Sequence, residues 1–283
     1  MKVVAIVPTY NRPELLLKNL NCLLKQTVAI EKIILVDNAS DSNTKEILDR
    51  NALIGHEKIL YHRLDVNQGA SGGFKTAMQL AMEFKPDWIW GMDDDAFPRE
   101  DALENLLSSL GHFDANDNVV LWSNCDEDTD FTNDYKKVEH FMFVGFFIPI
   151  ELIQKIGYPD TNFYMYHDDT EYSARIIRAG YSINKIRNSI IDHKGYDKRG
   201  PSPFLDFNIF GKSVRLYNFE GYRVYYILRN QYYVSGDGFL SKARYHKYMI
   251  FNIFKYLALK PSLTKYVLLA YCHIITGRRG KVL

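Results

Sequence analysis

The chain has 283 residues, of which 47% are hydrophobic and 24% charged, a composition typical of a globular protein with one large domain or two modest ones. The three cysteines are scattered and odd in number, so they imply neither a disulfide framework nor a CxxC metal site. The formal net charge of +1 gives no reason to expect a nucleic-acid partner. We find neither a secretory signal nor the run of about 20 apolar residues that a membrane span needs, so we expect a cytoplasmic protein.

The first half of the chain alternates short β-branched runs with segments of helical periodicity. Because strands and helices alternate, we expect an α/β domain with a mostly parallel, doubly wound sheet. Ligands of such sheets bind beyond the carboxyl ends of the strands, where polar clusters stand at residues 9–12, 37–41 and 93–95. The expected strands are 2–7 (stopped by a proline), 32–36, 58–64, 87–92 and 119–123, and the expected helices are 12–26, 44–50, 71–84 and 99–110.

The second half is less regular. We expect strands at 141–149 and 182–192 and helices at 150–156 and 168–179. Residues 195–221 are rich in glycine, proline and aromatic residues and predict an ordered loop, and the segment that follows, 222–233, is apolar and aromatic.

Asp93, Asp94 and Asp95 follow a run of aromatic residues that has the character of a buried strand. Like charges this close to an apolar interior cost stability unless a cation offsets them. Side-chain alternation places Asp93 and Asp95 on the same side, and hard cations prefer such paired oxygens. The alternatives are a solvated loop or a cap for the helix expected at residue 99.

A second acidic cluster, Asp168, Asp169 and Glu171, opens an expected helix. It can serve as a helix cap, or as a fixed general base beside a ligand. His193, at the end of an apolar strand, is either an ordinary edge residue or a metal ligand. Arg229-Asn230 can be a buried ion-pair partner or can hold a phosphate.

The glycine-rich stretch 68–73 precedes a helix, where free backbone N–H groups could bind an anion. It lacks the spacing of a dinucleotide fingerprint, and no GK[ST] follows it, so a P-loop is excluded.

Taken in order, IVPTYNR at 6–12, VDNAS at 36–40, the Asp triplet and HDDTE at 167–171 resemble the inverting GT-A glycosyltransferases of family 2. The triple Asp, the segment 67–74 and the pattern YYxxRN are similar to the bacterial galactofuranosyl- and rhamnosyltransferase branch. The resemblance covers residues 1–233 and, in weaker form, the tail at 277–280. It implies a GT-A catalytic domain at 1–235, with a nucleotide-sugar-binding half (1–125) and an acceptor-binding half (126–235), and a helical extension at 236–283.

The same resemblance implies roles for single residues. Asp93, Asp95 and His193 would bind Mn²⁺ or Mg²⁺, with Asp169 as general base. Asp168 and Glu171 would orient the acceptor sugar. His167 stands where galactofuranosyltransferases often have Trp, which is a departure from the pattern. The residues expected to contact the donor are Pro8, Thr9, Asn11, Arg12, Asp37 (facing the uracil), Asn67, Gly69, Asp93 and Asp94.

The activity that this implies is metal-dependent transfer of a sugar, with UDP-galactofuranose as the first expectation and TDP-rhamnose or a UDP-hexopyranose as alternatives. The acceptor would be a glycan carried on a polyprenyl diphosphate. The rivals are a nucleotidyltransferase, which normally has a glycine-rich loop after its first strand, and a non-catalytic glycan-binding or assembly subunit.

From residue 241 to 283 the chain has nine basic residues and no Asp or Glu. Aromatic, aliphatic and lysine residues are interleaved there, as in helices that lie on anionic lipid. We therefore expect this tail to bind the inner face of the cell membrane, the alternative being a helical subdomain packed on the catalytic core.

Overall fold

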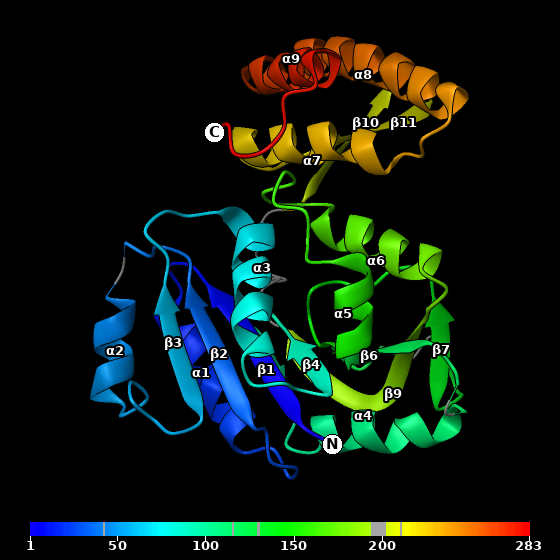
Figure 1. Cartoon of the computed structure of the whole chain (residues 1–283). Coiled ribbons are helices and arrows are strands. Elements are labelled where there is room, and N and C mark those ends of the chain that lie inside the picture. Colours follow the sequence, from blue (N-terminus) through cyan, green and yellow to red (C-terminus); the bar gives the residue numbers. More distant parts are fainter. Residues whose placement is uncertain (42, 115, 129–130, 194–201, 210) are drawn as a thin grey trace. The chain divides into compact units, whose positions relative to one another are not determined.

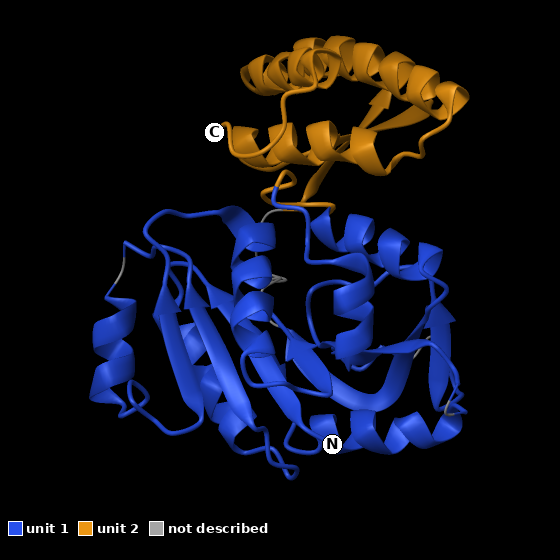
Figure 2. Cartoon of the chain, in the orientation of Figure 1, with its two compact units in different colours: residues 1–161, 168–196 blue, residues 162–167, 197–283 orange. Residues whose placement is uncertain are grey.

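The computed structural model describes residues 1–41, 43–114, 116–128, 131–193, 202–209 and 211–283, and the chain forms two compact units. Unit 1 comprises residues 1–161 and 168–196, and unit 2 comprises residues 162–167 and 197–283 (Figure 2). The functional division expected at residue 235 stays a prediction.

Unit 1 is built around one nine-stranded sheet in the order β3-β2-β1-β4-β8-β6-β9-β5, with β7 also paired to β9 (Figure 1). Its elements are β1 (Val3–Thr9), α1 (Pro13–Leu24), β2 (Lys32–Asp37), α2 (Thr44–Arg50), β3 (Ile59–Arg63), α3 (Gly69–Met82), β4 (Trp88–Gly91), β5 (Ala96–Pro98), α4 (Ala102–Ser109), the 3-10 turn η1 (Leu110–His112), β6 (Val119–Cys125), β7 (Tyr135–Val138), β8 (Phe146–Pro149), α5 (Ile150–Ile156), α6 (Asp168–Arg178) and β9 (Ser182–His193).

The sheet is mixed but mostly parallel, as expected. Strands β1, β2, β3, β4, β6 and β9 share one direction, whereas β5, β7 and β8 run the opposite way. Alternating residues of β1 face opposite layers: Val3, Ala5 and Val7 pack with α1, α2 and α4, whereas Val4 and Ile6 pack with α3, α5 and α6. The sheet therefore has a hydrophobic core on each face, which is the doubly wound arrangement.

Three local expectations were wrong. Strand β1 does not stop before Pro8, because Pro8 and Thr9 still pair with β2. Proline is tolerated there because the pairing with β4 ends at Ile6, so no donor is needed on that side. The expected strand 141–149 is confined to β8, and the expected loop 195–221 contains a hairpin of β10 (Phe204–Ile209) and β11 (Lys212–Tyr217), with residues 194–201 and 210 outside the described range.

Unit 2 is the hairpin β10–β11 with three helices, α7 (Gly221–Val234), α8 (Phe239–Leu259) and α9 (Pro261–Thr276). Helix α9 packs on both α7 and α8. The core of this unit is rich in tyrosine, including Tyr225, Tyr226 and Tyr256, which have no exposed surface or almost none. Within the described residues, no helix has the length and apolarity to cross a bilayer.

Candidate active site

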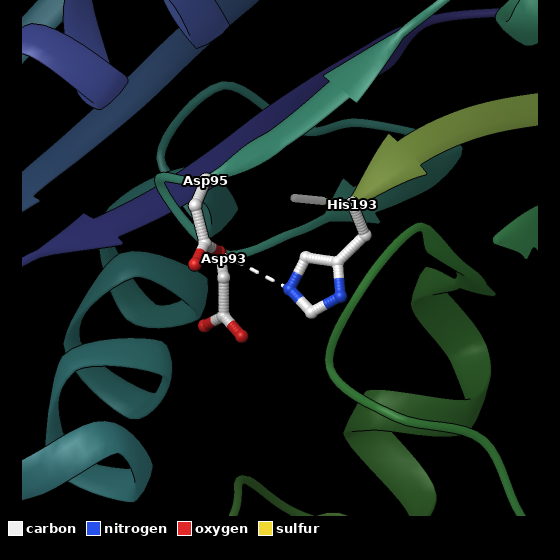
Figure 3. Close-up of side chains that lie close together, drawn as sticks. All are labelled: Asp93, Asp95 and His193. Atoms are coloured by element: carbon white, nitrogen blue, oxygen red, sulfur yellow. Dashed lines mark hydrogen bonds and ion pairs between the residues drawn. The ribbon is translucent and has the colours of Figure 1, made fainter. Parts of the chain in front are cut away.

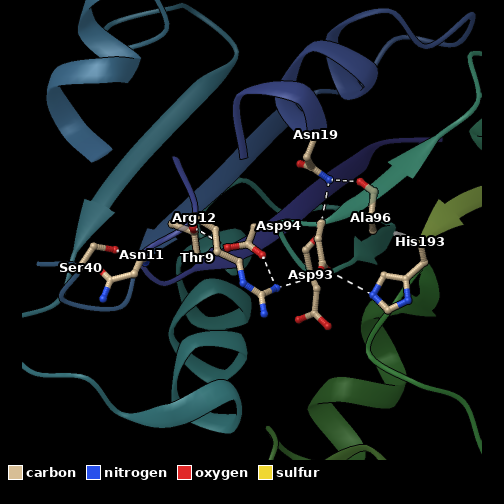
Figure 4. A network of polar contacts seen from close by, with 10 residues as sticks. Thr9, Asn11, Arg12, Asn19, Ser40, Asp93, Asp94, Ala96 and His193 are labelled. Carbon is tan, nitrogen blue, oxygen red and sulfur yellow. Dashed lines mark hydrogen bonds and ion pairs between the residues drawn. The ribbon is translucent and has the colours of Figure 1, made fainter. Parts of the chain in front are cut away.

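The carboxyl ends of β1, β2 and β4 meet at one edge of the sheet, which confirms that the three polar clusters gather there (Figure 4). The Asn38 backbone N–H donates to the Thr9 carbonyl at 2.9 Å. The Thr9 hydroxyl donates to Asp94 Oδ2 at 2.7 Å. The Asn11 N–H donates to Ser40 Oγ at 3.0 Å, which joins the first cluster to the second.

Arg12 is the counter-ion of the acidic triplet. Its Nη1 lies 2.7 Å from Asp95 Oδ2 and 3.4 Å from Asp94 Oδ1. The guanidinium is about half exposed, whereas both carboxylates are almost fully buried. Asp94 and Asp95 are thus buried and ion-paired, so the triplet is not a solvated loop. A contact between Arg12 and the nucleotide stays a prediction.

His193 reaches the triplet through the register of two strands. Strand β5 follows the triplet directly and pairs antiparallel with β9, with Ala96 opposite His193. His193 Nε2 therefore lies 3.2 Å from Asp95 Oδ1. One ligand atom from each of Asp93, Asp95 and His193 lies within 4.8 Å of the other two (Figure 3). Two carboxylates and an imidazole suit Mn²⁺, so the donor set fits the expected cation.

The three carboxyl groups have different pKa values. Burial, with the charges of Asp95 and Asp94, raises the pKa of Asp93 to about 8. Burial also raises the pKa of Asp94 to about 6, against the hydrogen bond from Thr9 and the charge of Arg12. For Asp95, burial is outweighed by the hydrogen bond and charge of His193 and by Arg12, so its pKa is lowered. A divalent cation held by these groups would favour the ionised forms of Asp93 and Asp95.

Asn19 was missed in the sequence. It lies on α1 with no exposed surface, and its Nδ2 donates to the carbonyls of Ala96 at 2.5 Å and Asp93 at 3.5 Å. These bonds hold the turn that carries the triplet. The only signal was a polar residue among the apolar positions of an amphipathic helix, which marks a buried hydrogen-bonding role.

The end of β2 is tied to the start of α3. The Asn38 side chain donates to the Gly69 carbonyl and accepts from the Gln68 N–H, both at 2.8 Å. Asn67 Oδ1 accepts from the Gly69 N–H at 2.8 Å. Helix α3 also lies close to β1, since a Cβ on Gly73 would come within 2.8 Å of Pro8. This fixes the glycine-rich turn beside the strand ends.

Asp37 is fully buried, with both oxygens engaged. Its Oδ1 accepts from the Ser40 N–H at 2.8 Å, and its Oδ2 accepts from the Tyr61 hydroxyl at 2.7 Å and from Arg63 at 3.2 Å. Asp37 therefore stabilises the turn after β2. Its contact with the uracil stays a prediction.

The second acidic cluster begins α6. Asp168 is 5% exposed, and its Oδ2 has no hydrogen-bond partner among the described residues. Burial raises the pKa of Asp168, and the charges of Asp169 and of Asp93 raise it further. The influence of Asp93 places this cluster within electrostatic range of the triplet. Burial likewise raises the pKa of Asp169, whose Oδ1 accepts from the Thr170 N–H at 2.6 Å.

Glu171, unlike Asp168 and Asp169, forms an ion pair within α6. Its carboxylate pairs with Arg175 at 2.8 Å, and Arg175 also donates to the carbonyls of Ile156 and Tyr158. The pair anchors α6 to the end of α5. A contact of Glu171 with the acceptor sugar stays a prediction.

A mixed, mostly parallel α/β sheet with an acidic motif at its strand ends is the architecture of GT-A glycosyltransferases. Among solved structures, the chain is similar to the mannosyltransferase PcManGT of Pyrobaculum calidifontis in complex with GDP-Man and Mn²⁺. The TM-score is 0.62 at 17% identity, over 98% of this chain and 88% of that one. The two proteins share the GT-A fold.

The chain belongs to glycosyl transferase family 2, whose family model matches residues 4–174. It is a nucleotide-sugar glycosyltransferase. The galactofuranosyltransferase GlfT1 of Mycobacterium tuberculosis is 24% identical to it over 277 residues, which are 89% of this chain and 88% of that protein. GlfT1 of Mycolicibacterium smegmatis is 25% identical over 203 residues, 63% of this chain and 66% of the relative.

Proposed function

We propose that this chain transfers galactofuranose from UDP-galactofuranose to a hydroxyl of a lipid-linked bacterial glycan, with inversion at the anomeric carbon. The observation that carries the proposal is the convergence of Asp93, Asp95 and His193 within 4.8 Å in a chain that is similar to galactofuranosyltransferases. A second acidic pair, Asp168 and Asp169, begins α6, and Asp168 is buried. Metal-dependent sugar transfer needs a metal site, here Asp93, Asp95 and His193, and a separate carboxylate that serves as general base.

Asp93, Asp95 and His193 would hold Mn²⁺ or Mg²⁺, which would neutralise the charge that develops on the leaving diphosphate. Asp169 would accept the proton of the attacking hydroxyl as the new glycosidic bond forms and the sugar–phosphate bond breaks. The burial that raises the pKa of Asp169 makes it a stronger base than an exposed aspartate. Asp168, whose buried Oδ2 has no hydrogen-bond partner among the described residues, would hold a second group of the acceptor.

The donor is proposed from similarity to GlfT1, and a hexopyranose donor is the second candidate because a mannosyltransferase shares the fold. A panel of UDP-galactofuranose, TDP-rhamnose, UDP-hexoses and GDP-mannose would separate them. The assay measures nucleotide release with Mn²⁺ and polyprenyl-diphosphate-linked glycans extracted from bacterial membranes. We expect UDP release from UDP-galactofuranose that requires both metal and acceptor. In a parallel assay with nucleoside triphosphates and sugar 1-phosphates, pyrophosphate release would indicate a nucleotidyltransferase. No release with any of these substrates would indicate a non-catalytic subunit.

The membrane part of the proposal rests on the outer faces of α8 and α9. Each helix buries one side in unit 2, yet the opposite side is also apolar. Helices at a water-exposed surface normally carry polar residues there. The exposed apolar side chains are Phe239, Leu240, Ile250, Phe251, Phe254 and Leu257 on α8, and Leu268 and Ile275 on α9.

The charge of this segment identifies the surface that it fits. All nine ionised side chains between residues 241 and 283 are basic, among them Arg244, Lys247 and Lys265 on the exposed faces of α8 and α9. Apolar side chains bordered by lysine and arginine match the acyl boundary and phosphates of an anionic bilayer. We therefore propose that unit 2 docks on the membrane that carries the acceptor.

A further inference from the structure

The segment that leads into the proposed general base is a strained loop. Residues 162–167 belong to unit 2, and the next residues in the chain are Asp168 and Asp169. Tyr164, Tyr166 and His167 have φ values of 64°, 63° and 63°, in the left-handed region that side chains with a Cβ disfavour. Such a backbone persists only where surrounding contacts hold it.

Arg229 supplies part of these contacts. It lies on α7 with no exposed surface. Its Nη2 donates to the carbonyls of Asn162 and Phe163, both at 3.2 Å, and its Nη1 donates to the Gly280 carbonyl at 2.7 Å. Among the described residues its partners are neutral, so it is not the ion-pair partner considered from the sequence. Burying a guanidinium without an opposite charge costs free energy of desolvation. Stability alone is therefore a weak reason for a buried arginine at this position.

Asn230 holds the rest of the loop. Its Nδ2 donates to the carbonyls of Phe163 at 2.8 Å, Met165 at 2.8 Å and Tyr166 at 3.0 Å, and its Oδ1 accepts from Arg229 Nε at 2.9 Å. Two adjacent side chains of α7 thus bind the carbonyls of four of the six loop residues. The loop cannot change its backbone conformation without breaking several of these bonds.

The end of the chain completes the arrangement. The Gly280 N–H donates to the Asn162 carbonyl at 2.8 Å, so Gly280 both accepts from Arg229 and binds the loop. The Arg279 guanidinium lies over the ring of Phe163, with 5.1 Å between the guanidinium carbon and the ring centroid. The Val282 N–H donates to the Tyr226 hydroxyl at 2.9 Å, which fixes the tail to α7.

We propose that Arg229 and Asn230 are positioning residues for sugar transfer. They hold the 162–167 loop, and the loop sets the backbone from which Asp168 and Asp169 project. The inference rests on the proposed role of Asp169. Because a shift of about 1 Å in a reacting group can reduce the rate about 100-fold, a released loop would impair transfer while leaving the metal site intact.

The chain offers a matched control for the test. Asn230 and Asn252 are both 1% exposed and both lie in helices of unit 2. Among the described residues, the side chain of Asn252 donates only within α8, to the Tyr248 carbonyl at 2.9 Å. The variants Asn230→Ala and Asn252→Ala therefore remove equal side chains from equal burial. Only the first removes bonds to the loop. Arg229→Lys, which keeps the charge and loses the forked donors, provides a second variant.

Three measurements on the full-length variants decide the proposal. Hydrogen exchange of residues 162–167 should accelerate in Asn230→Ala and Arg229→Lys but not in Asn252→Ala. Calorimetric binding of UDP with Mn²⁺ should equal that of the wild type in all three. Acceptor-dependent UDP release from UDP-galactofuranose should fall about 10- to 100-fold in the first two alone.

Unchanged exchange of the loop in Asn230→Ala, or equal losses of transfer in Asn230→Ala and Asn252→Ala, would overturn the proposal. If the wild type itself fails to bind UDP with Mn²⁺, the proposed function is contradicted. The exchange measurement would still show whether Arg229 and Asn230 hold the loop, so the two failures are distinguishable.

Discussion

His193 Nε2 lies 3.2 Å from Asp95 Oδ1 although the two residues are 98 positions apart in the chain. The contact exists because β5 places Ala96 opposite His193 in β9. If this histidine is a metal ligand, His193→Ala should weaken Mn²⁺ binding at least as much as the loss of an outer-shell partner, about 10- to 100-fold. Mn²⁺ titration followed by electron paramagnetic resonance measures the affinity.

The control is His112→Ala, which removes a histidine that also lies near a carboxylate, 3.9 Å from Asp134, but outside the triplet. This variant should bind Mn²⁺ as the wild type does. Equal affinities of His193→Ala and the wild type would restrict His193 to an ion pair with Asp95.

Asp169→Asn should retain UDP and Mn²⁺ binding and lose sugar transfer. The amide has nearly the size of the carboxylate but cannot accept the proton of the attacking hydroxyl. Calorimetry measures binding, and UDP release in the presence of acceptor measures transfer. Full transfer by the variant would refute the assignment of the base.

The pH dependence of wild-type transfer tests the same assignment independently. Burial raises the pKa of Asp169, so its ionised, base-competent form should appear only above the pH at which an ordinary aspartate ionises. The rate should therefore rise with pH along an acid limb whose apparent pKa exceeds about 4. At saturating Mn²⁺, which would keep Asp93 ionised, the residual rate of Asp169→Asn should lack this limb.

Asn19→Ala should destabilise unit 1 and weaken the metal site. It leaves the buried carbonyls of Asp93 and Ala96 without their donor, which costs about 1–3 kcal/mol in the free energy of unfolding. Urea denaturation gives the stability, and the Mn²⁺ titration gives the affinity. Asn21→Ala, at an exposed position of the same helix, should change neither. A stable variant with normal Mn²⁺ affinity would show that the turn carrying the triplet keeps its conformation without the hydrogen bonds of Asn19.

The double variant Phe251→Ser and Phe254→Ser should lose binding to vesicles that contain phosphatidylglycerol. These side chains are 59% and 63% exposed, so their replacement removes apolar contact with lipid without opening a core. Flotation of the full-length chain measures the bound fraction. The matched control replaces Val66 and Ile177, exposed apolar residues of unit 1, by Ser. Equal flotation of both variants and the wild type would contradict the membrane surface.

The gathering of the polar clusters at the strand ends was predicted well, because a chain of alternating strands and helices can adopt only a few sheet topologies. Once β1, β2 and β4 are parallel neighbours, Thr9, Asp37 and Asp93 must lie at one edge. His193 was different. Its meeting with Asp95 depends on β5, a strand of three residues that no periodicity can reveal, so only the family resemblance pointed to it.

Unit 2 was less predictable. The hairpin β10–β11 lies where the abundance of glycine, proline and aromatic residues suggested a loop, yet Asp206 and Arg215 face each other across its strands with a hydrogen bond of 2.7 Å. The hydrogen bonds of Arg229 and Asn230 could not be predicted either, because most of their partners are backbone carbonyls far away in the sequence. Every residue has a backbone carbonyl, so the residue types along the chain do not indicate which carbonyls accept these bonds.

The central claim is that the acidic triplet binds a divalent cation together with a nucleotide diphosphate. Isothermal titration calorimetry of the full-length chain with UDP, in the presence and absence of Mn²⁺, tests it most directly. We predict saturable UDP binding that requires Mn²⁺ and disappears in Asp95→Ala. Folded wild-type protein that binds no UDP in excess Mn²⁺ would contradict the account.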